Sequence, residues 1–309
     1  MAITITGGAT ITGGANIGTG GGSPSPSPSV SFGYVSGGQG DIDNIDKFPF
    51  STDANATDVG DLTVARYGCA GQSSSMSGYA SGGGYPTINV IDKFPFASNG
   101  NATDVGDITL ARMYVTGQSS SDNGYVCGGF NSPGLRWSNV IDKFSFASDG
   151  NATDAADLTE GKMFGAGQNS STHGYDSTGN DSNGDRNIIN KFSFASDSNA
   201  TNVGTLSVAA TASAGNSSLD NGYNSSGNSV LNLINKFPFA NESNGSDVGD
   251  LTIARGSACG QSNSASGYVS GGSSTGGNII EKFPFASDGN ATDVGDLTTD
   301  FTLSAGQQG

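Results

Sequence analysis

The sequence predicts an all-β protein folded as a closed six-bladed β-propeller, with a short β tail at its N-terminus. A unit whose core reads I-D-K-F or a close variant recurs along the sequence, with its lysine at Lys47, Lys93, Lys143, Lys191, Lys236 and Lys282. A Gly-Tyr pair precedes every core, and a polar turn such as N-G-N-A follows it. Self-similarity at a period of 45–50 residues indicates a repeat architecture, and no helical periodicity accompanies it.

The first 29 residues differ from the rest of the protein. Residues 1–22 read as three short motifs, AITITGG, ATITGG and ANIGTGG. Alternation of Ile with Thr gives short strands with one apolar face, formed by Ile3, Ile5, Ile11 and Ile17. Strands this short need an outside partner, so we expect an anchoring tail, with a flexible terminus as the alternative. Residues 23–29, SPSPSPS, form a stiff linker of roughly 20 Å.

From residue 30 to residue 309 each unit supplies four strand candidates. In the second copy these are residues 66–74, 78–83, 88–98 and 103–112. Four short strands in each radial repeat are typical of a propeller blade. Of the 16 phenylalanines, 12 belong to the K-F-x-F element, so these aromatic side chains are the expected core.

The two ends of the sequence predict that the ring is closed. The propeller enters at residues 31–38, which match the second strand of a unit, and it finishes at residues 302–309, which match a first strand. We therefore expect the C-terminal strand to complete the N-terminal blade. An open solenoid would need capping repeats instead.

Charge and hydropathy exclude several classes of partner. The net charge is −16 with only 12 Lys and Arg, which do not cluster, so we expect no nucleic-acid binding. No stretch reaches the length of about 18 apolar residues that membrane insertion requires. The N-terminus has no basic segment followed by an apolar one, so a secretory signal peptide is not expected.

The inventory of reactive side chains argues against an enzyme. The sole histidine, His173, lies in a predicted turn, so a catalytic triad, a zinc site and a copper site are all disfavoured, and we expect no cofactor or metal. Asp181, Asn183 and Asp185 alternate as in a calcium loop, but no bidentate Glu follows at the right distance. The three cysteines are interpreted as small core residues.

Two other recurring patterns have structural interpretations. Acid pairs in the T-D-V-G-D element, such as Asp58/Asp61, recur in most units, which favours turn capping or contacts between blades, with arginines as possible partners, over catalysis. Asn-Ala-Thr triplets match the glycosylation pattern, but they mark the same turn in each unit, and repetition explains them. They begin at Asn55, Asn101, Asn151, Asn199 and Asn290.

The connection between the second and third strands varies freely among copies, whereas the turn after the third strand hardly changes. In a propeller all copies of this variable connection emerge on one face. Aromatic and arginine side chains, which are enriched at binding hot spots, would gather there. The predicted ligand-binding face comprises Tyr85, Arg136, Trp137, Asp185 and Arg186. Drift of loops without a function is the alternative explanation.

The unit resembles the kelch repeat over residues 30–309. The positions of that pattern are held in the second copy by Arg66, Tyr79, Gly82/Gly83, Asp92 with Phe94, Ile108 and Arg112. The kelch tryptophan of the fourth strand is missing, the sole Trp137 lies in a loop, and two repeats lack the Gly-Gly pair. Similarity between copies, Asn/Ser-rich turns and the ITITGG leader also resemble repeat-containing structural proteins of marine bacteriophages. This second resemblance implies a virion protein.

We therefore expect a non-enzymatic structural protein of a phage virion: a decoration, fibre or host-contact propeller anchored by its tail. The resemblance implies that it is made in the host cytoplasm and located in the virion. Its expected partners are other virion proteins or further copies of itself through the tail, and a host surface glycan or protein. The alternative is a carbohydrate-binding propeller or adhesin on a bacterial cell surface. A degenerate propeller enzyme is the third possibility.

Overall fold

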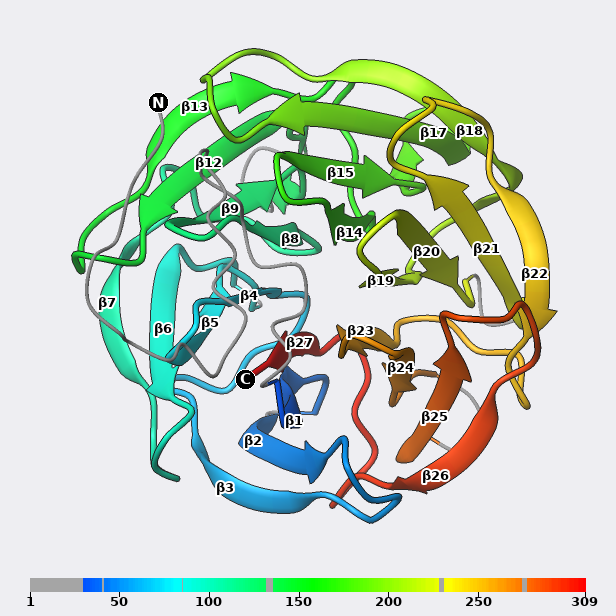
Figure 1. Ribbon diagram of the computed structural model, residues 1–309. Helices are drawn as coiled ribbons and strands as arrows, with labels where there is room; N and C mark the ends of the chain where they lie inside the picture. Colours follow the sequence, from blue (N-terminus) through cyan, green and yellow to red (C-terminus); the bar gives the residue numbers. More distant parts are fainter. Residues whose placement is uncertain (1–29, 41, 85, 132–135, 228–230, 274–276) are drawn as a thin grey trace, which may run out of the picture.

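The computed structural model describes residues 30–40, 42–84, 86–131, 136–227, 231–273 and 277–309. These residues form a six-bladed β-propeller, with the sheets arranged radially around a central axis (Figure 1). This part of the protein holds no helix that could cross a membrane. The predicted tail and linker lie outside the described residues, so the anchor through Ile3, Ile5, Ile11 and Ile17 stays a prediction.

Each blade runs outward from the axis through four antiparallel strands. Blade 2 consists of β4 (Ala70–Ser73), β5 (Ser77–Ser81), β6 (Val90–Pro95) and β7 (Thr103–Asp107). Blade 3 consists of β8 (Thr116–Ser119), β9 (Asn123–Cys127), β12 (Val140–Ser145) and β13 (Thr153–Asp157). Blade 4 consists of β14 (Ala166–Asn169), β15 (His173–Ser177), β17 (Gly184–Ser193) and β18 (Thr201–Ala210). Blade 5 consists of β19 (Ala214–Ser217), β20 (Asn221–Ser225), β21 (Leu233–Pro238) and β22 (Ser246–Asp250). Blade 6 consists of β23 (Cys259–Ser262), β24 (Ser266–Ser270), β25 (Ile279–Pro284) and β26 (Thr292–Asp296).

Blade 1 joins the two ends of the propeller, as the sequence predicts. Its inner strand is β27 (Ala305–Gln308), which pairs with β1 (Phe32–Gly38) and places Gln307 opposite Tyr34. The outer strands are β2 (Ile42–Pro49) and β3 (Thr57–Asp61). Ring closure through the C-terminal strand is therefore confirmed. It leaves no blade with an unpaired inner position.

The variable connections of two blades contain hairpins of their own. In blade 3, β10 (Phe130–Asn131) pairs with β11 (Arg136–Trp137), and in blade 4, β16 (Asn180–Asp181) pairs with the start of β17. The sequence placed Trp137 in a loop. The structure corrects this, since Trp137 ends a two-residue strand opposite Phe130.

The core lies between blades rather than within any one of them. Tyr79 of blade 2 packs on Phe144 and Phe146 of blade 3, with ring centroids 5.4 and 4.9 Å apart. The tyrosine and phenylalanines at the other joints pack in the same way. A Cβ at Gly78 would lie 2.3 Å from the Phe94 ring, so the residue before the tyrosine has to be small. The recurring Gly-Tyr and K-F-x-F motifs are thus two halves of one aromatic joint.

Candidate functional site

Most polar residues that recur in the unit join one blade to the next. The Gln72 amide nitrogen donates to the backbone oxygen of Tyr125 in the following blade at 3.1 Å, and its amide oxygen accepts from Ser81 at 2.9 Å. The equivalent donors to a tyrosine carbonyl are Gln118, Gln168, Asn216, Gln261 and Gln307. These side chains are buried and engaged by the scaffold, so they are poor candidates for ligand contacts.

A buried acid on the third strand links each blade to the connection that leads into it from the preceding blade. Asp92 accepts hydrogen bonds from the backbone and hydroxyl of Thr63 at 2.9 and 2.7 Å, and it pairs with Arg66 at 3.0 Å. Both charged side chains are fully buried. Arg112–Asp142 and Arg255–Glu281 repeat the pair at 2.9 and 2.7 Å. Charges buried this deeply require such pairing, so these acids are structural.

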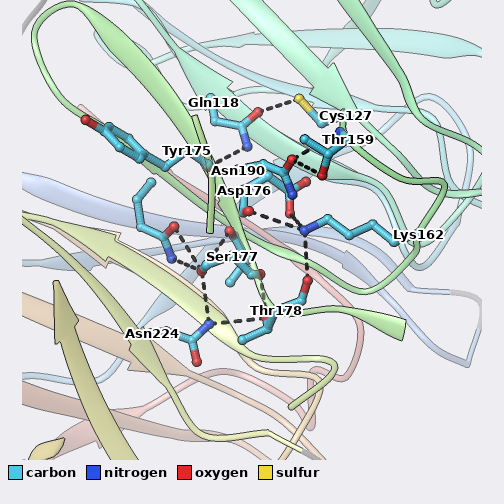
Figure 2. A network of polar contacts seen from close by, with 12 residues as sticks. Gln118, Cys127, Thr159, Lys162, Tyr175, Asp176, Ser177, Thr178, Asn190 and Asn224 are labelled. Carbon is cyan, nitrogen blue, oxygen red and sulfur yellow. Dashed lines mark hydrogen bonds and ion pairs between the residues drawn. The ribbon is translucent and has the colours of Figure 1, made fainter. Parts of the chain in front are cut away.

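Blade 4 keeps the buried pair but moves the acid to a neighbouring strand (Figure 2). Asn190 occupies the usual acid position and accepts from Thr159. The acid is instead Asp176 on β15, 2.7 Å from the ammonium of Lys162. Burial raises the pKa of Asp176, and Lys162 opposes that shift. The pair is almost fully buried and linked to backbone carbonyls, so we interpret it as a displaced structural pair rather than a catalytic one.

In the two remaining blades the positions of the buried cation and acid are occupied differently. In blade 5 neither of these two buried positions is charged: Ala210 occupies the position of the cation and Asn235 that of the acid. Blade 1 keeps the acid, Asp46, but Phe301 stands where the arginine would be. Asp46 is fully buried and is held by hydrogen bonds of 2.7 Å from Thr298, and burial raises its pKa.

The exposed acid pairs and the N-A-T asparagines also serve the scaffold. The Asp58 carboxylate caps its turn by accepting from the Gly60 amide at 3.2 Å, as Asp104 does from Gly106. The proposed arginine partners for these acids were wrong, because the arginines pair with the third-strand acids. Asn101 accepts from the Asp61 amide of the preceding blade at 3.2 Å, so its side chain is already engaged between blades.

The central axis narrows at a waist made only of glycine. The inner strands contribute Gly71, Gly117, Gly167, Gly215, Gly260 and Gly306. A Cβ at any of these positions would lie 2.1–2.4 Å from a glycine carbonyl oxygen of the adjacent blade, so no side chain fits there. The waist separates two axial cavities of about 120 and 190 Å³.

The smaller cavity is bounded by a closed ring of backbone hydrogen bonds. The residue two positions before each inner strand donates its amide to the carbonyl of its counterpart in the preceding blade, over 2.7–3.0 Å. We call these the ring residues: Gly68, Tyr114, Phe164, Ala212, Ser257 and Leu303. They define the ring mouth, where this cavity opens. All six have positive φ, between 56° and 66°.

The ring mouth has an aromatic side and a small-residue side. The Tyr114 and Phe164 rings stack with centroids 3.9 Å apart, and Tyr67 lies beside Tyr114 at 6.1 Å. Burial and the neighbouring Tyr67 hydroxyl raise the pKa of Tyr114 to about 12, so the phenol stays a neutral hydrogen-bond donor. Ala212 and Ser257 follow Phe164 around the ring, and Leu303 lies opposite Phe164. Every described residue that lines this cavity is uncharged.

The two hairpins stand directly behind the aromatic side. Met113, next to Tyr114, exchanges backbone hydrogen bonds with Phe130 of β10. Met163, next to Phe164, does the same with Asn180 of β16. The hairpins therefore continue the wall of the ring mouth outward over blades 3 and 4. In blade 6 the described residues repeat the bridge alone, between Gly256, next to Ser257, and Ser273.

The predicted binding-face residues lie on this same face but farther from the axis. Arg136 and Trp137 are exposed on β11, and Trp137 packs edge-on against Phe130. Arg186 on β17 pairs with Asp181, whose carboxylate also accepts from the Asn183 amide. Asp185 accepts from the Asn180 side chain at 3.0 Å. Tyr85 lies outside the described residues.

Sequence reasoning missed Tyr67, Tyr114 and Phe164. The available signal was variation at one position of an otherwise uniform unit, just before the inner strand, where the copies read Gly, Tyr, Phe, Ala, Ser and Leu. Nothing in the sequence shows that these positions meet at the axis, because about 46 residues separate successive copies. The packing of successive blades around the axis brings them together.

The remaining reactive side chains do not form a further site in the described residues. His173 begins β15 and is half-buried, and burial and Lys191 lower its pKa. The sequence placed it in a turn, and the structure corrects this, because His173 is the first residue of a strand. Cys69, Cys127 and Cys259 are buried and free, and burial raises the pKa of each thiol. Among the described residues, no three His, Cys, Asp or Glu side chains are grouped so that they could hold a metal.

The larger cavity opens on the opposite face, at what we call the serine mouth. Its rim includes Ser73, Ser119, Ser217, Ser262 and Gln308. Serine hydroxyls of this rim accept amide hydrogen bonds across the joints, as Ser73 does from Gln308 at 3.0 Å. Val30, the first residue that the structure describes, also lines this mouth, on the face opposite the ring mouth.

Compared with known proteins, the sequence matches no family model and no curated sequence. The assignment of a function therefore depends on the site itself.

Proposed function

We propose that this protein is a non-enzymatic attachment protein whose ring mouth binds a neutral sugar of a surface glycan. The observation that carries the proposal is the left-handed backbone at Tyr114, Phe164 and Leu303, with φ of 57–59°. The Cβ of any non-glycine residue costs about 1–2 kcal/mol in this conformation, so these three residues carry a strain that Gly68, at an equivalent place, does not. Strain retained at the rim of a cavity favours a role for those side chains in binding.

The chemistry of the mouth fits a neutral polyhydroxyl ligand. Tyr114 offers an aromatic face together with a phenol that is protonated at neutral pH. Ser257 and Ser304, on the more open part of the lining, supply hydroxyl groups. A sugar ring has apolar C–H faces and a polar edge, so it can pack on the aromatic side and hydrogen-bond with the serines. An uncharged lining gives no specific attraction to phosphate or carboxylate.

The position of Val30 supports an attachment role. A tail joined at the serine mouth would leave the ring mouth and its hairpins facing away from whatever the tail holds. The resemblance to phage structural proteins favours a virion as the site of anchoring, with the kelch-like propeller as the part that contacts the host. A bacterial surface adhesin with the same two faces is the alternative location.

Glycan-array binding of the purified protein tests the ligand. Phe164→Gly copies the natural Gly68 and should abolish the signal for a neutral sugar. Its free energy of unfolding should change by less than about 1 kcal/mol, because relief of backbone strain offsets the lost aromatic stack. Trp137→Ala, on the outer hairpin, is the matched control. Undiminished binding by folded Phe164→Gly would refute the site.

Deletion of residues 1–29 tests the anchor separately. We expect the shortened protein to keep the circular dichroism spectrum and the sugar binding of the full-length protein. It should no longer associate with particles or with itself. Normal association of the deleted form would place the attachment surface on the blades and would contradict the proposed role of the tail.

A further inference from the structure

Five of the blade joints in the described structure carry the same surface ion pair, and one does not. The lysine of each K-F-x-F element reaches the turn that follows the third strand of the next blade. The pairs are Lys93–Asp149, Lys143–Asp197, Lys191–Glu242, Lys236–Asp288 and Lys282–Asp53, at 2.8–3.1 Å. At the joint between blades 1 and 2 the partner is an amide, and the Lys47 ammonium donates to the Asn99 side-chain oxygen at 3.4 Å.

We propose that Asn99 is a site of spontaneous deamidation, which converts it to the carboxylate that the other joints already carry. Asn99 is exposed and is followed by Gly100. A Cβ added at Gly100 would meet no atom within 4 Å, and among the described residues no hydrogen bond engages the Gly100 amide N–H. The nucleophile for the reaction is therefore free in the folded protein.

The reaction needs only this dipeptide and water. The Gly100 backbone nitrogen attacks the carboxamide carbon (Cγ) of Asn99, forming a new bond to that carbon and losing its proton to solvent. The original bond between Cγ and the amide nitrogen then breaks and ammonia leaves, which gives a cyclic succinimide. Water opens the succinimide at one carbonyl to give aspartate or at the other to give isoaspartate. No electron transfer occurs, and the net change is one water consumed and one ammonia released.

Lys47 is positioned to assist the attack. Negative charge develops on the Asn99 side-chain oxygen in the tetrahedral intermediate, and the ammonium donates to that atom. A cation beside a developing oxyanion lowers the barrier. Lys47 also lacks the carboxylate that acts on its counterpart: burial lowers the pKa of Lys47, whereas the hydrogen bond with Asp149 raises the pKa of Lys93.

The other Asn-Gly pairs of the protein lack this combination. Asn123 and Asn221 are held in β9 and β20. The Asn244 side-chain oxygen accepts from the Thr205 amide of the preceding blade at 3.0 Å. Asn183 lies in the β16–β17 turn beside the Asp181 carboxylate, which disfavours a second negative charge. Asn99 should therefore react first.

The folded protein also favours one product. Only aspartate places a carboxylate where Asp149 stands relative to Lys93, because isoaspartate reroutes the backbone through Cγ of residue 99. Isoaspartate can close to the succinimide again, whereas aspartate is retained by its pair with Lys47. Conversion would give this joint the surface ion pair that its counterparts have.

Mass spectrometry of the intact folded protein, incubated at mildly alkaline pH and then digested with trypsin, tests the proposal. The peptide 94–112 should gain the mass of amide-to-acid conversion several-fold faster than peptide 163–186, which contains Asn183. Lys47→Gln should slow the conversion several-fold, and Lys47→Arg should preserve it. Gly100→Ala should block it, and the fold tolerates this change because Ala54 holds the equivalent position in blade 1.

Each result bears on a separate step. Enrichment of aspartate over isoaspartate in the folded protein, relative to the protein in urea, would support selection by Lys47. An Asn99 peptide that keeps its amide while the Asn183 peptide converts would overturn the proposal. Equal rates in Lys47→Gln and the parent protein would overturn the role of the lysine. Conversion only after unfolding in urea would show that the folded turn does not react.

Discussion

The neutral joint of blade 5 provides a template for testing the buried ion pairs. Arg112 is fully buried, pairs with Asp142 at 2.9 Å and donates to the backbone oxygens of Gly128 and Val126 at 2.6 and 3.0 Å. Ala210 and Asn235 hold the corresponding positions in blade 5 without any charge. The double variant Arg112→Ala/Asp142→Asn therefore gives blade 3 the uncharged pair of residues that blade 5 carries naturally.

The expected magnitudes follow from burial. Arg112→Ala leaves a fully buried carboxylate without its cation, and Asp142→Asn leaves a buried guanidinium without its anion. Removing one partner of a buried pair costs about 3–5 kcal/mol. The double variant removes both charges, so its cost should fall short of the sum of the single costs by about 2–3 kcal/mol. A residual loss remains, because the arginine stem and its carbonyl contacts are absent.

Urea unfolding followed by circular dichroism measures all four proteins under the same conditions. The coupling free energy is the difference between the cost of the double variant and the summed costs of the single variants. Costs that add to within about 0.5 kcal/mol would mean that the two side chains act independently. That result would refute the interpretation of the pair as a coupled charge at the blade joint.

Three further predictions concern one glycine of the waist and two positions at which a single blade departs from the repeated unit. Gly117→Ala should lose about 1–3 kcal/mol of stability in the same unfolding assay, because its Cβ would meet the Gly71 oxygen at 2.2 Å. Gly289→Ala, in open space, should remain near the parent value. Asn216→Gln should gain about 1 kcal/mol by reaching Ser225, since among the described residues the Asn216 oxygen and the Ser225 hydroxyl lack partners; no gain would contradict this. Burial raises the pKa of Asp46 above its ordinary value of 3.8, so its contribution to stability is largest below pH 3.8 and is lost as the pH rises through the raised pKa. Asp46→Asn should flatten that part of the stability–pH curve, and an unchanged curve would refute the assignment.

The sequence alone determined the architecture of the propeller. The period, the alternation within strands and the Gly-rich turns depend on local backbone preferences, which any copy of the unit displays. The displaced first strand at residues 302–309 predicted closure, which the β1–β27 pairing confirms. The phenylalanines of K-F-x-F were predicted as core because they are large, apolar and repeated, and the structure packs them between blades. The tail at residues 1–22 and the attachment function stay predictions.

Only the tertiary structure decided which side chains meet. Asp92 and Arg66 are 26 residues apart, and their pairing depends on how the third strand of a blade faces the connection before it. In blade 4 the acid comes from β15 instead, and Lys162 pairs with Asp176. The repeat pattern alone would predict the acid at position 190. Local preferences cannot resolve this choice, because either strand can bring a carboxylate to the cation.

The ring mouth is the clearest case of side-chain contacts that the sequence did not predict. Tyr114 and Phe164 come from connections 50 residues apart, each ordinary within its own unit. Closing six blades around one axis brings the residue two positions before every inner strand within hydrogen-bonding distance of its neighbour and gives it positive φ. The packing of blade 4 against blade 3 also stacks the two rings, with centroids 3.9 Å apart. These contacts result from rotational packing of whole blades, which sequence spacing does not encode.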